Sequence, residues 1–191
     1  MAKEREQQII RAAAKRFARH GMGKTTLDEI ARDIRIGKAT IYHYFESKDE
    51  LFFAALKWEA DQFIEDIKAI FNNPDLAVGA RMLEYISFKE NIDTRYKLLF
   101  DLLLKLVEDE SFEKEKKILK ELLQKEEEIV KLVLSSIYSR RLEGMNESLP
   151  NFVVTSSWGA FFGNKLNNIT HPDKVLNSRD FVFRSLENIL S

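Results

Sequence analysis

The sequence predicts an all-α fold, and three observations support this prediction. The 191 residues include only 7 Gly and 3 Pro, so few positions would break a helix. Apolar residues recur along nearly the whole chain at the 3.6-residue period of an amphipathic helix, and no segment alternates as a strand does. Hydrophobic residues make up 45% and charged residues 32%, a balance typical of a chain that buries a globular core. About nine helices account for this pattern.

The first helix is expected to end near residue 20. Ile10, Ala13, Ala14 and Phe17 occupy positions i, i+3, i+4 and i+7, which places them on one face of a helix. The pattern stops at Gly21, a residue type that commonly terminates helices.

Two short helices are expected next. Thr26 and Glu29 have the S/T-x-x-E spacing of a capping box, which opens the first of them. The second is expected to begin at Gly37 or Lys38 and to run through Tyr44.

Longer helices are expected to fill the rest of the chain. Ser47 and Glu50 form a second capping box before a helix that runs to about Ile70. Asn73-Pro74 is expected to end this helix and to begin the next one. Pro74 would lie in the first turn of that next helix, where its missing N–H is harmless. The remaining helices are expected up to Lys89, from Thr94 to Val107, from Ile118 to Ile137 and, after a loop over residues 144–150, through Phe162 and through Ile189. The charges at 114–120 and 126–128 are expected on a solvated helix face.

Several classes of protein are disfavoured. The chain contains no Cys, which removes disulfides and thiolate chemistry. The histidines, His20, His43 and His171, lack the Glu-x-x-His spacing of a helical-bundle metal site, and the sequence has no P-loop, G-x-S-x-G or G-x-G-x-x-G motif. We therefore expect no enzymatic activity and no cofactor. A charged N-terminus, and an apolar run at 98–107 too short for a bilayer, favour a cytoplasmic protein with no membrane partner.

Charge is distributed unevenly along the chain. The net charge is −1, but residues 1–48 contain 11 Lys/Arg against 6 Asp/Glu, a balance of +5, which leaves −6 for residues 49–191. This asymmetry favours a basic, phosphate-facing domain over residues 1–48 and an acidic helical domain over residues 49–191.

The stretch TTLDEIARDIRIGKATIYHYFESKDEL, from Thr25 to Leu51, predicts a helix-turn-helix, because two short helices flank a turn of three or four residues. The second helix has two apolar positions, Ile41 and Phe45, and its other side chains are small, basic or hydrogen-bonding. Such a surface suits the DNA major groove. The aromatic residues also allow a plain core role, which we prefer for Phe45.

Individual side chains suggest individual contacts. Lys38 can reach guanine acceptors or a phosphate, and the methyl groups of Ala39 and Thr40 can meet a thymine methyl. Lys48, beside backbone amides capped by Ser47, offers a further phosphate site.

The same residues resemble the signature of the tetracycline-repressor (TetR) family. The similarity rests on TLDEIA at 26–31, KATIYHYF at 38–45 and SKDEL at 47–51, with FARHG at 17–21 upstream, and it is specific over residues 5–56. Two positions depart from the family pattern, which usually has Gly where Arg35 stands and Ser or Thr where Gly37 stands. A non-glycine residue strains the turn if its φ is positive there, and Gly is a weaker N-cap than Ser.

The resemblance implies roles for eight side chains. Base-facing positions are matched by Lys38, Ala39, Thr40 and His43. Phosphate-contacting positions are matched by Thr26, Tyr42, Tyr44 and Lys48.

The resemblance also implies a homodimer on a pseudo-palindromic DNA operator, paired through its last two helices. Its second domain would hold a small apolar or aromatic effector whose binding releases a repressor from DNA. The aromatic candidates for that pocket are Tyr85, Phe88, Tyr96, Phe100, Trp158, Phe161 and Phe162. For each residue taken singly, a place in the core or at the dimer surface is the more common role. Gly159 and Gly163, four residues apart, would allow close approach of the partner's helix. The alternative is a DNA-binding regulator or architectural protein with no effector.

Overall fold

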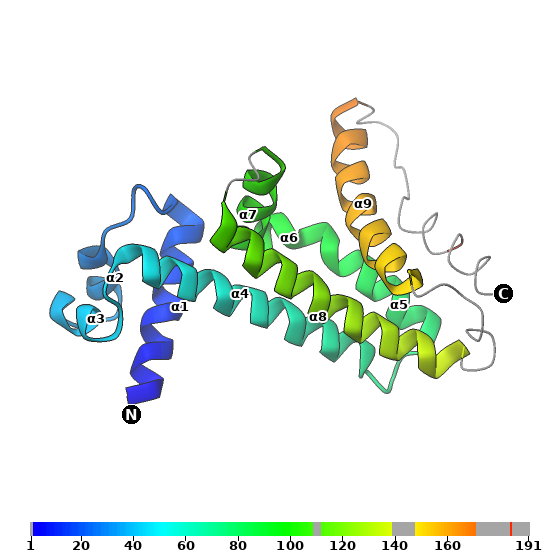
Figure 1. Ribbon diagram of the computed structural model, residues 1–191, viewed down its shortest axis with the longest axis horizontal. Coiled ribbons are helices and arrows are strands. Elements are labelled where there is room, and N and C mark those ends of the chain that lie inside the picture. Colours follow the sequence, from blue (N-terminus) through cyan, green and yellow to red (C-terminus); the bar gives the residue numbers. More distant parts are fainter. Residues whose placement is uncertain (1, 109–111, 139–147, 171–183, 185–191) are drawn as a thin grey trace. The chain divides into compact units, whose positions relative to one another are not determined.

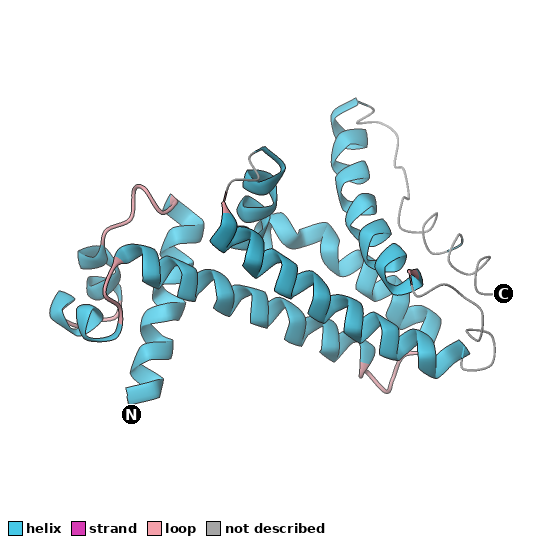
Figure 2. Ribbon diagram, viewed as in Figure 1, coloured by secondary structure: helices cyan, strands magenta, loops and turns pink. Residues whose placement is uncertain are grey.

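The computed structural model describes residues 2–108, 112–138, 148–170 and 184, and every regular element within these ranges is a helix (Figure 2). The all-α prediction is confirmed. The helix expected through Ile189, and most of the loop expected before Pro150, lie outside the described residues.

The chain forms two compact units. The first comprises Met1–Phe63 and Tyr96–Ile118, and the second comprises Ile64–Arg95 and the described part of Leu119–Ser191. The boundary predicted after residue 48 coincides with the start of a helix within the first unit, and it stays a prediction.

The helices follow the chain order drawn in Figure 1. The first unit contains α1 (Ala2–His20), α2 (Leu27–Asp33), α3 (Lys38–Tyr44), the start of α4 (Lys48–Phe71), α7 (Lys97–Glu108) and the start of α8 (Glu113–Tyr138). The second unit contains the rest of α4 and α8, together with α5 (Val78–Phe88), the 3-10 turn η1 (Lys89–Asn91), α6 (Ile92–Arg95) and α9 (Leu149–Thr170).

Helix α1 forms as its periodicity predicts. Its buried side chains include Ile10, Ala13, Ala14 and Phe17. The helix ends at Gly21, which adopts φ +76° and donates its N–H to the Phe17 carbonyl at 2.8 Å. A residue in this left-handed conformation ends a helix cleanly, and glycine adopts it without a steric penalty.

The two predicted capping boxes differ. At α2, the Thr26 side chain accepts from the Glu29 N–H, and the Glu29 carboxylate accepts from the Thr26 N–H, so the box is complete. At α4, Ser47 Oγ accepts from the Glu50 N–H at 3.0 Å, but the Glu50 carboxylate accepts from the Glu46 N–H at 2.6 Å. The second carboxylate reaches one residue beyond the expected partner.

Three helix boundaries differ from the predictions. Pro74 does not lie in a first helical turn, because the Asn73 side chain accepts from the Asp75 N–H and forms a turn there, and α5 begins only at Val78. Pro150, expected in a loop, lies in the first turn of α9, where proline is well tolerated. The single helix expected from Thr94 to Val107 is divided into α6 and α7.

The solvated face expected on α8 is only partly present. Glu128 is exposed, but Glu126 is fully buried and Glu115 is nearly so. The prediction was wrong for these two residues because each has a basic partner distant in sequence, Lys89 for Glu126 and Lys105 for Glu115.

Candidate nucleic-acid interface

Helix α3 is held by two apolar side chains and exposes the rest. Ile41 is 0% exposed and Phe45 4%, which confirms the core role that the sequence indicated for both. The Tyr42 side chain is 50% exposed, which is a large exposed fraction for an aromatic residue. Packing of the core therefore does not explain its presence. The exposed side chains are Lys38, Ala39, Tyr42 and His43, while Thr40 and Tyr44 are half-buried. All six of these candidate DNA-contacting residues therefore lie on α3.

The turn between α2 and α3 is strained at one position. Arg35 has φ 56°, in the left-handed region that disfavours side chains with a Cβ. Gly37 is the N-cap of α3 and provides no side-chain hydrogen bond. Both consequences expected of the departures at these positions are therefore present.

Thr26 and Lys48, predicted to contact phosphate, lie at the edges of the helix-turn-helix. The exposed Thr26 hydroxyl is held by Glu29 in the capping box. The Lys48 ammonium donates to the carbonyl oxygens of Met22, at 3.0 Å, and Thr25, at 3.2 Å. Because an ammonium has three N–H groups, this clamp fixes the α1–α2 loop and still leaves one donor.

Lys38 forms an ion pair across the helix-turn-helix that the sequence reading missed. Its Nζ lies 2.8 Å from Asp28 Oδ2, and the hydrogen bond to Asp28 raises the pKa of Lys38. Both side chains are about half exposed, so the pair is weak and exchangeable. A phosphate or guanine acceptor can therefore replace Asp28 without a large desolvation cost.

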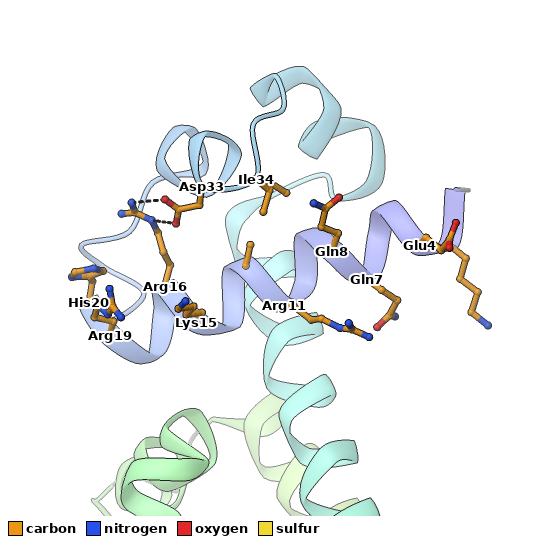
Figure 3. A pocket seen from close by; sticks show the side chains of 12 residues that line it. Glu4, Gln7, Gln8, Arg11, Lys15, Arg16, Arg19, His20, Asp33 and Ile34 are labelled. Atoms are coloured by element: carbon orange, nitrogen blue, oxygen red, sulfur yellow. Dashed lines mark hydrogen bonds and ion pairs between the residues drawn. The ribbon is translucent and has the colours of Figure 1, made fainter.

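A second missed network joins α1 to α2. The Arg16 guanidinium donates to both carboxylate oxygens of Asp33, at 2.7 and 3.1 Å (Figure 3). It also lies 3.3 Å from Glu29. The hydrogen bond from Arg16 lowers the pKa of Asp33, and this bidentate geometry orients α2 on α1. The cluster of acidic residues on so short a helix was the available signal.

Three further basic side chains of α1 have no hydrogen-bond or ion-pair partner among the described residues. Arg11, Lys15 and Arg19 follow one another at intervals of four residues, are exposed and project from α1 (Figure 3). None of the three forms an ion pair or hydrogen bond with the described residues. They give a positive charge to this face of the helix-turn-helix head, which comprises α1, α2 and α3.

The structure separates the seven aromatic residues predicted to line an effector pocket. Tyr96 lies in the first unit, against Phe63 with ring centroids 5.3 Å apart, and Phe100 lies in the same unit. The others lie in the second unit: Tyr85, Trp158 and Phe161 are buried, and Phe88 and Phe162 are half-buried. Phe88 borders a hollow of about 480 Å³ in the second unit. Their role in ligand binding stays a prediction.

Fold and interface together define a helix-turn-helix protein with a helical body. Residues 9–55 match the family model "Bacterial regulatory proteins, tetR family". The chain is 39% identical over 67 residues to the HTH-type transcriptional regulator HbdR of Aromatoleum sp. (strain CIB), a match that covers 35% of this chain and 29% of HbdR. The helix-turn-helix part of the chain therefore matches the TetR family of transcriptional regulators.

Solved structures extend the fold similarity to nearly the whole chain. A transcriptional regulator from Cytophaga hutchinsonii is 26% identical, with a TM-score of 0.64 over 96% of this chain and 93% of that one. Reduced NemR from E. coli is 16% identical, with a TM-score of 0.71 over 97% of both chains, and shares the fold. By sequence, the chain spans less than half the length of the curated relatives, 29% of HbdR and 48% of YhgD from Bacillus subtilis. Among the described helices, none has the length and apolar character needed to cross a membrane.

Proposed function

We propose that this protein is a sequence-specific DNA-binding transcriptional regulator that inserts α3 into the major groove. The observation that carries the proposal is the division of α3 into a buried side, Ile41 with Phe45, and a free side of small, basic and hydroxyl-bearing residues. A recognition helix needs such a division, because base edges are read by side chains that the fold leaves free. The TetR-family match over residues 9–55 contains this helix.

Phosphate contacts would come from the periphery of the same head. Tyr42 and Tyr44 lie on α3, and Thr26 and Lys48 lie before α2 and at the start of α4. Arg11 with its neighbours on α1 adds positive charge. Because phosphate neutralisation releases counterions, affinity for DNA should fall steeply as the salt concentration rises.

A homodimer on a pseudo-palindromic site completes the proposal. On α9, Phe152 is 47% exposed, and a Cβ added at Gly159 or Gly163 would meet no atom within 4 Å. An exposed apolar face with small residues allows a second helix to approach closely. We propose that the partner copy covers this face, together with the last helix of the chain.

The output is proposed to be repression by occlusion of a promoter, with release by a small apolar or aromatic ligand. The alternative is a DNA-binding regulator or architectural protein without an effector. An effector must lower operator affinity by binding one conformation better than the other. The alternative predicts an operator affinity that no small molecule changes.

Selection of bound sequences from a random duplex pool, followed by fluorescence anisotropy, tests the proposal. Lys38→Ala should weaken binding to the selected site by about 5–100-fold and relax the base preference. Tyr42→Phe should weaken binding to all sequences alike, because a phosphate contact carries no sequence information. Lys57→Ala, an exposed lysine of α4 outside the head's reading face, is the matched control. The proposed role of α3 is wrong if Lys38→Ala behaves like that control.

A further inference from the structure

The first unit contains a cavity of about 410 Å³ between the end of α1, α4, α7 and α8. Its volume lies within the range of about 300–1,000 Å³ typical of small-molecule sites. Its walls come from the end of α1, the first turns of α4, α7 and the start of α8: Phe17, Gly21, Met22, Asp49, Phe52, Phe53, Leu56, Leu98, Asp101, Leu102, Lys105 and Glu115. None of the predicted DNA contacts or pocket aromatics lines it.

The interior of the cavity is aromatic and aliphatic. Phe17 and Phe52 meet edge to face with ring centroids 5.4 Å apart, and Phe52 and Phe53 meet at 5.8 Å. Leu98 and Leu102 are buried in the opposite wall. Such walls favour the apolar body of a ligand and offer ring faces to a cation.

One of the three carboxylates that line the cavity has no ion-pair partner among the described residues. Lys105 is its only basic lining residue and is already paired with Glu115 at 2.9 Å. Asp101 is paired with Lys97. The carboxylate of Asp49 forms no hydrogen bond or ion pair with the described residues, although it lies on the cavity wall. A Lys114 ammonium 5.5 Å from the Phe53 ring shows that a cation is accommodated at one of these rings.

We infer that this cavity binds a small amphipathic cation, an apolar body with one amine or quaternary ammonium group. The rings and leucines enclose the body, and Asp49 receives the charge. This site deepens the proposed function, on which it rests, by placing the effector in the first unit, beside the loop that leads to α2, rather than among the aromatic residues of the second unit.

The position of the cavity provides a route to the DNA-binding residues. Gly21, Met22 and Asp49 are wall residues. Lys48, next to Asp49 in sequence, donates to the Met22 carbonyl and thereby fixes the loop that leads to Thr26. A ligand that displaces Met22 would loosen this clamp and change the position of a phosphate contact.

Calorimetric titration of the full chain with three probes of one shape tests the ligand class. 4-Phenylbutylamine, 4-phenylbutanol and 4-phenylbutyrate share an apolar body and differ in charge. We expect the amine to bind about 3–30-fold more tightly than the carboxylate, with the alcohol between them, since one charge at a partly exposed site attracts the amine and repels the carboxylate by up to about 1 kcal/mol each. The inference is overturned if the amine does not bind or if the carboxylate binds equally well.

Two variants locate the binding. Asp49→Asn should weaken binding of the amine by about 2–5-fold and leave binding of the alcohol unchanged, because it removes only the free charge. Glu50→Gln is the matched control: it removes a carboxylate from the same helical turn, outside the cavity. Met22→Trp should abolish binding of all three probes by filling the space. Equal effects of Asp49→Asn and Glu50→Gln would overturn the assignment.

Anisotropy of a labelled operator duplex then tests coupling to DNA. The amine should lower operator affinity of the wild type and not of Met22→Trp. If the probes bind as expected but the chain binds no DNA, the proposed function is wrong and the inferred ligand site is supported. If the chain binds DNA and no probe binds, the site fails alone.

Discussion

Both compact units bury a glutamate, but they provide it with different partners. In the second unit, Glu126 is 0% exposed and is paired with the equally buried Lys89. The Tyr85 hydroxyl donates to it at 2.6 Å, and the Trp158 indole N–H donates at 3.2 Å. In the first unit, Glu59 is 7% exposed and accepts from the Leu99 backbone N–H at 2.8 Å, in the first turn of α7.

The two carboxylates differ in the groups that face them, a buried ammonium for Glu126 and backbone amides for Glu59. Desolvation raises the pKa of Glu59 to about 7, because backbone amides oppose it only in part. Burial lowers the pKa of Lys89 to about 8, and the Glu126 charge limits the decrease. Near neutral pH, Lys89 thus remains mainly protonated, whereas Glu59 is about half protonated. Burial is similar in the two units, and the presence of a direct cationic partner separates the outcomes.

The largest effect is expected from breaking the compensated pair. Lys89→Met should lower the free energy of unfolding by about 3–5 kcal/mol, because it leaves Glu126 buried without a cation. The Lys89 ammonium also donates to Ser157 Oγ at 2.6 Å and lies 4.4 Å from the Trp158 ring centroid, and both contacts are lost. Urea denaturation of the purified protein measures the change.

The double variant Lys89→Met, Glu126→Gln distinguishes charge from packing. It should be more stable than Lys89→Met alone, because no uncompensated charge is left in the core. If both variants are equally destabilised, packing around Lys89 matters rather than its charge, and the contrast between the units is lost.

Local features of the first unit could be predicted from sequence, whereas its tertiary contacts could not. The Thr26 capping box, the Gly21 terminator and the apolar side of α3 depend on residues within about one helical turn, whose spacing is visible in the chain. Glu59 gave no such signal, because its partners in α7 lie 40 positions away.

The same reason explains the failure at Glu126. Its side chain was expected on a solvated face, since glutamates flanked by lysines in a helix usually are. Its partners Lys89 and Trp158 are 37 and 32 positions away in sequence, and only the tertiary fold brings them together. Likewise, the predicted pocket aromatics were chosen by type, and packing distributes them between both units.

A smaller effect, with a defined pH dependence, is expected at Glu59. Its pKa is about 7 in the folded chain against an ordinary value of 4.5 for a glutamate side chain, so the folded state binds the proton more tightly. Stability should therefore fall as pH rises from about 4.5 to about 7, by up to roughly 3 kcal/mol. Glu59→Gln, which keeps an acceptor for the Leu99 N–H, should abolish this part of the pH dependence and stabilise the protein at pH 8.

Denaturation curves of wild type and Glu59→Gln between pH 4.5 and pH 8 give the comparison. Asp75→Asn, an exposed carboxyl in the α4–α5 turn, is the control and should follow the wild type. Parallel pH profiles for all three proteins would show that Glu59 is charged at little cost, and the comparison with Glu126 would then fail.

The smallest effect is expected in the helix-turn-helix, where the cost lies in the backbone rather than in a buried charge. Arg35 has φ 56°, which costs a non-glycine residue about 1–2 kcal/mol, partly offset in a glycine variant by the greater entropy of its unfolded chain. Arg35→Gly should raise the free energy of unfolding by about 1 kcal/mol, which corresponds to roughly 2–4 °C in Tm. Arg35→Ala removes the same charge and keeps the strain, so it should gain nothing. An equal gain in both variants would show that the positive charge of Arg35, and not its backbone conformation, lowers the stability. Electrostatics would then determine the stability cost in the helix-turn-helix, as it does at the buried glutamates.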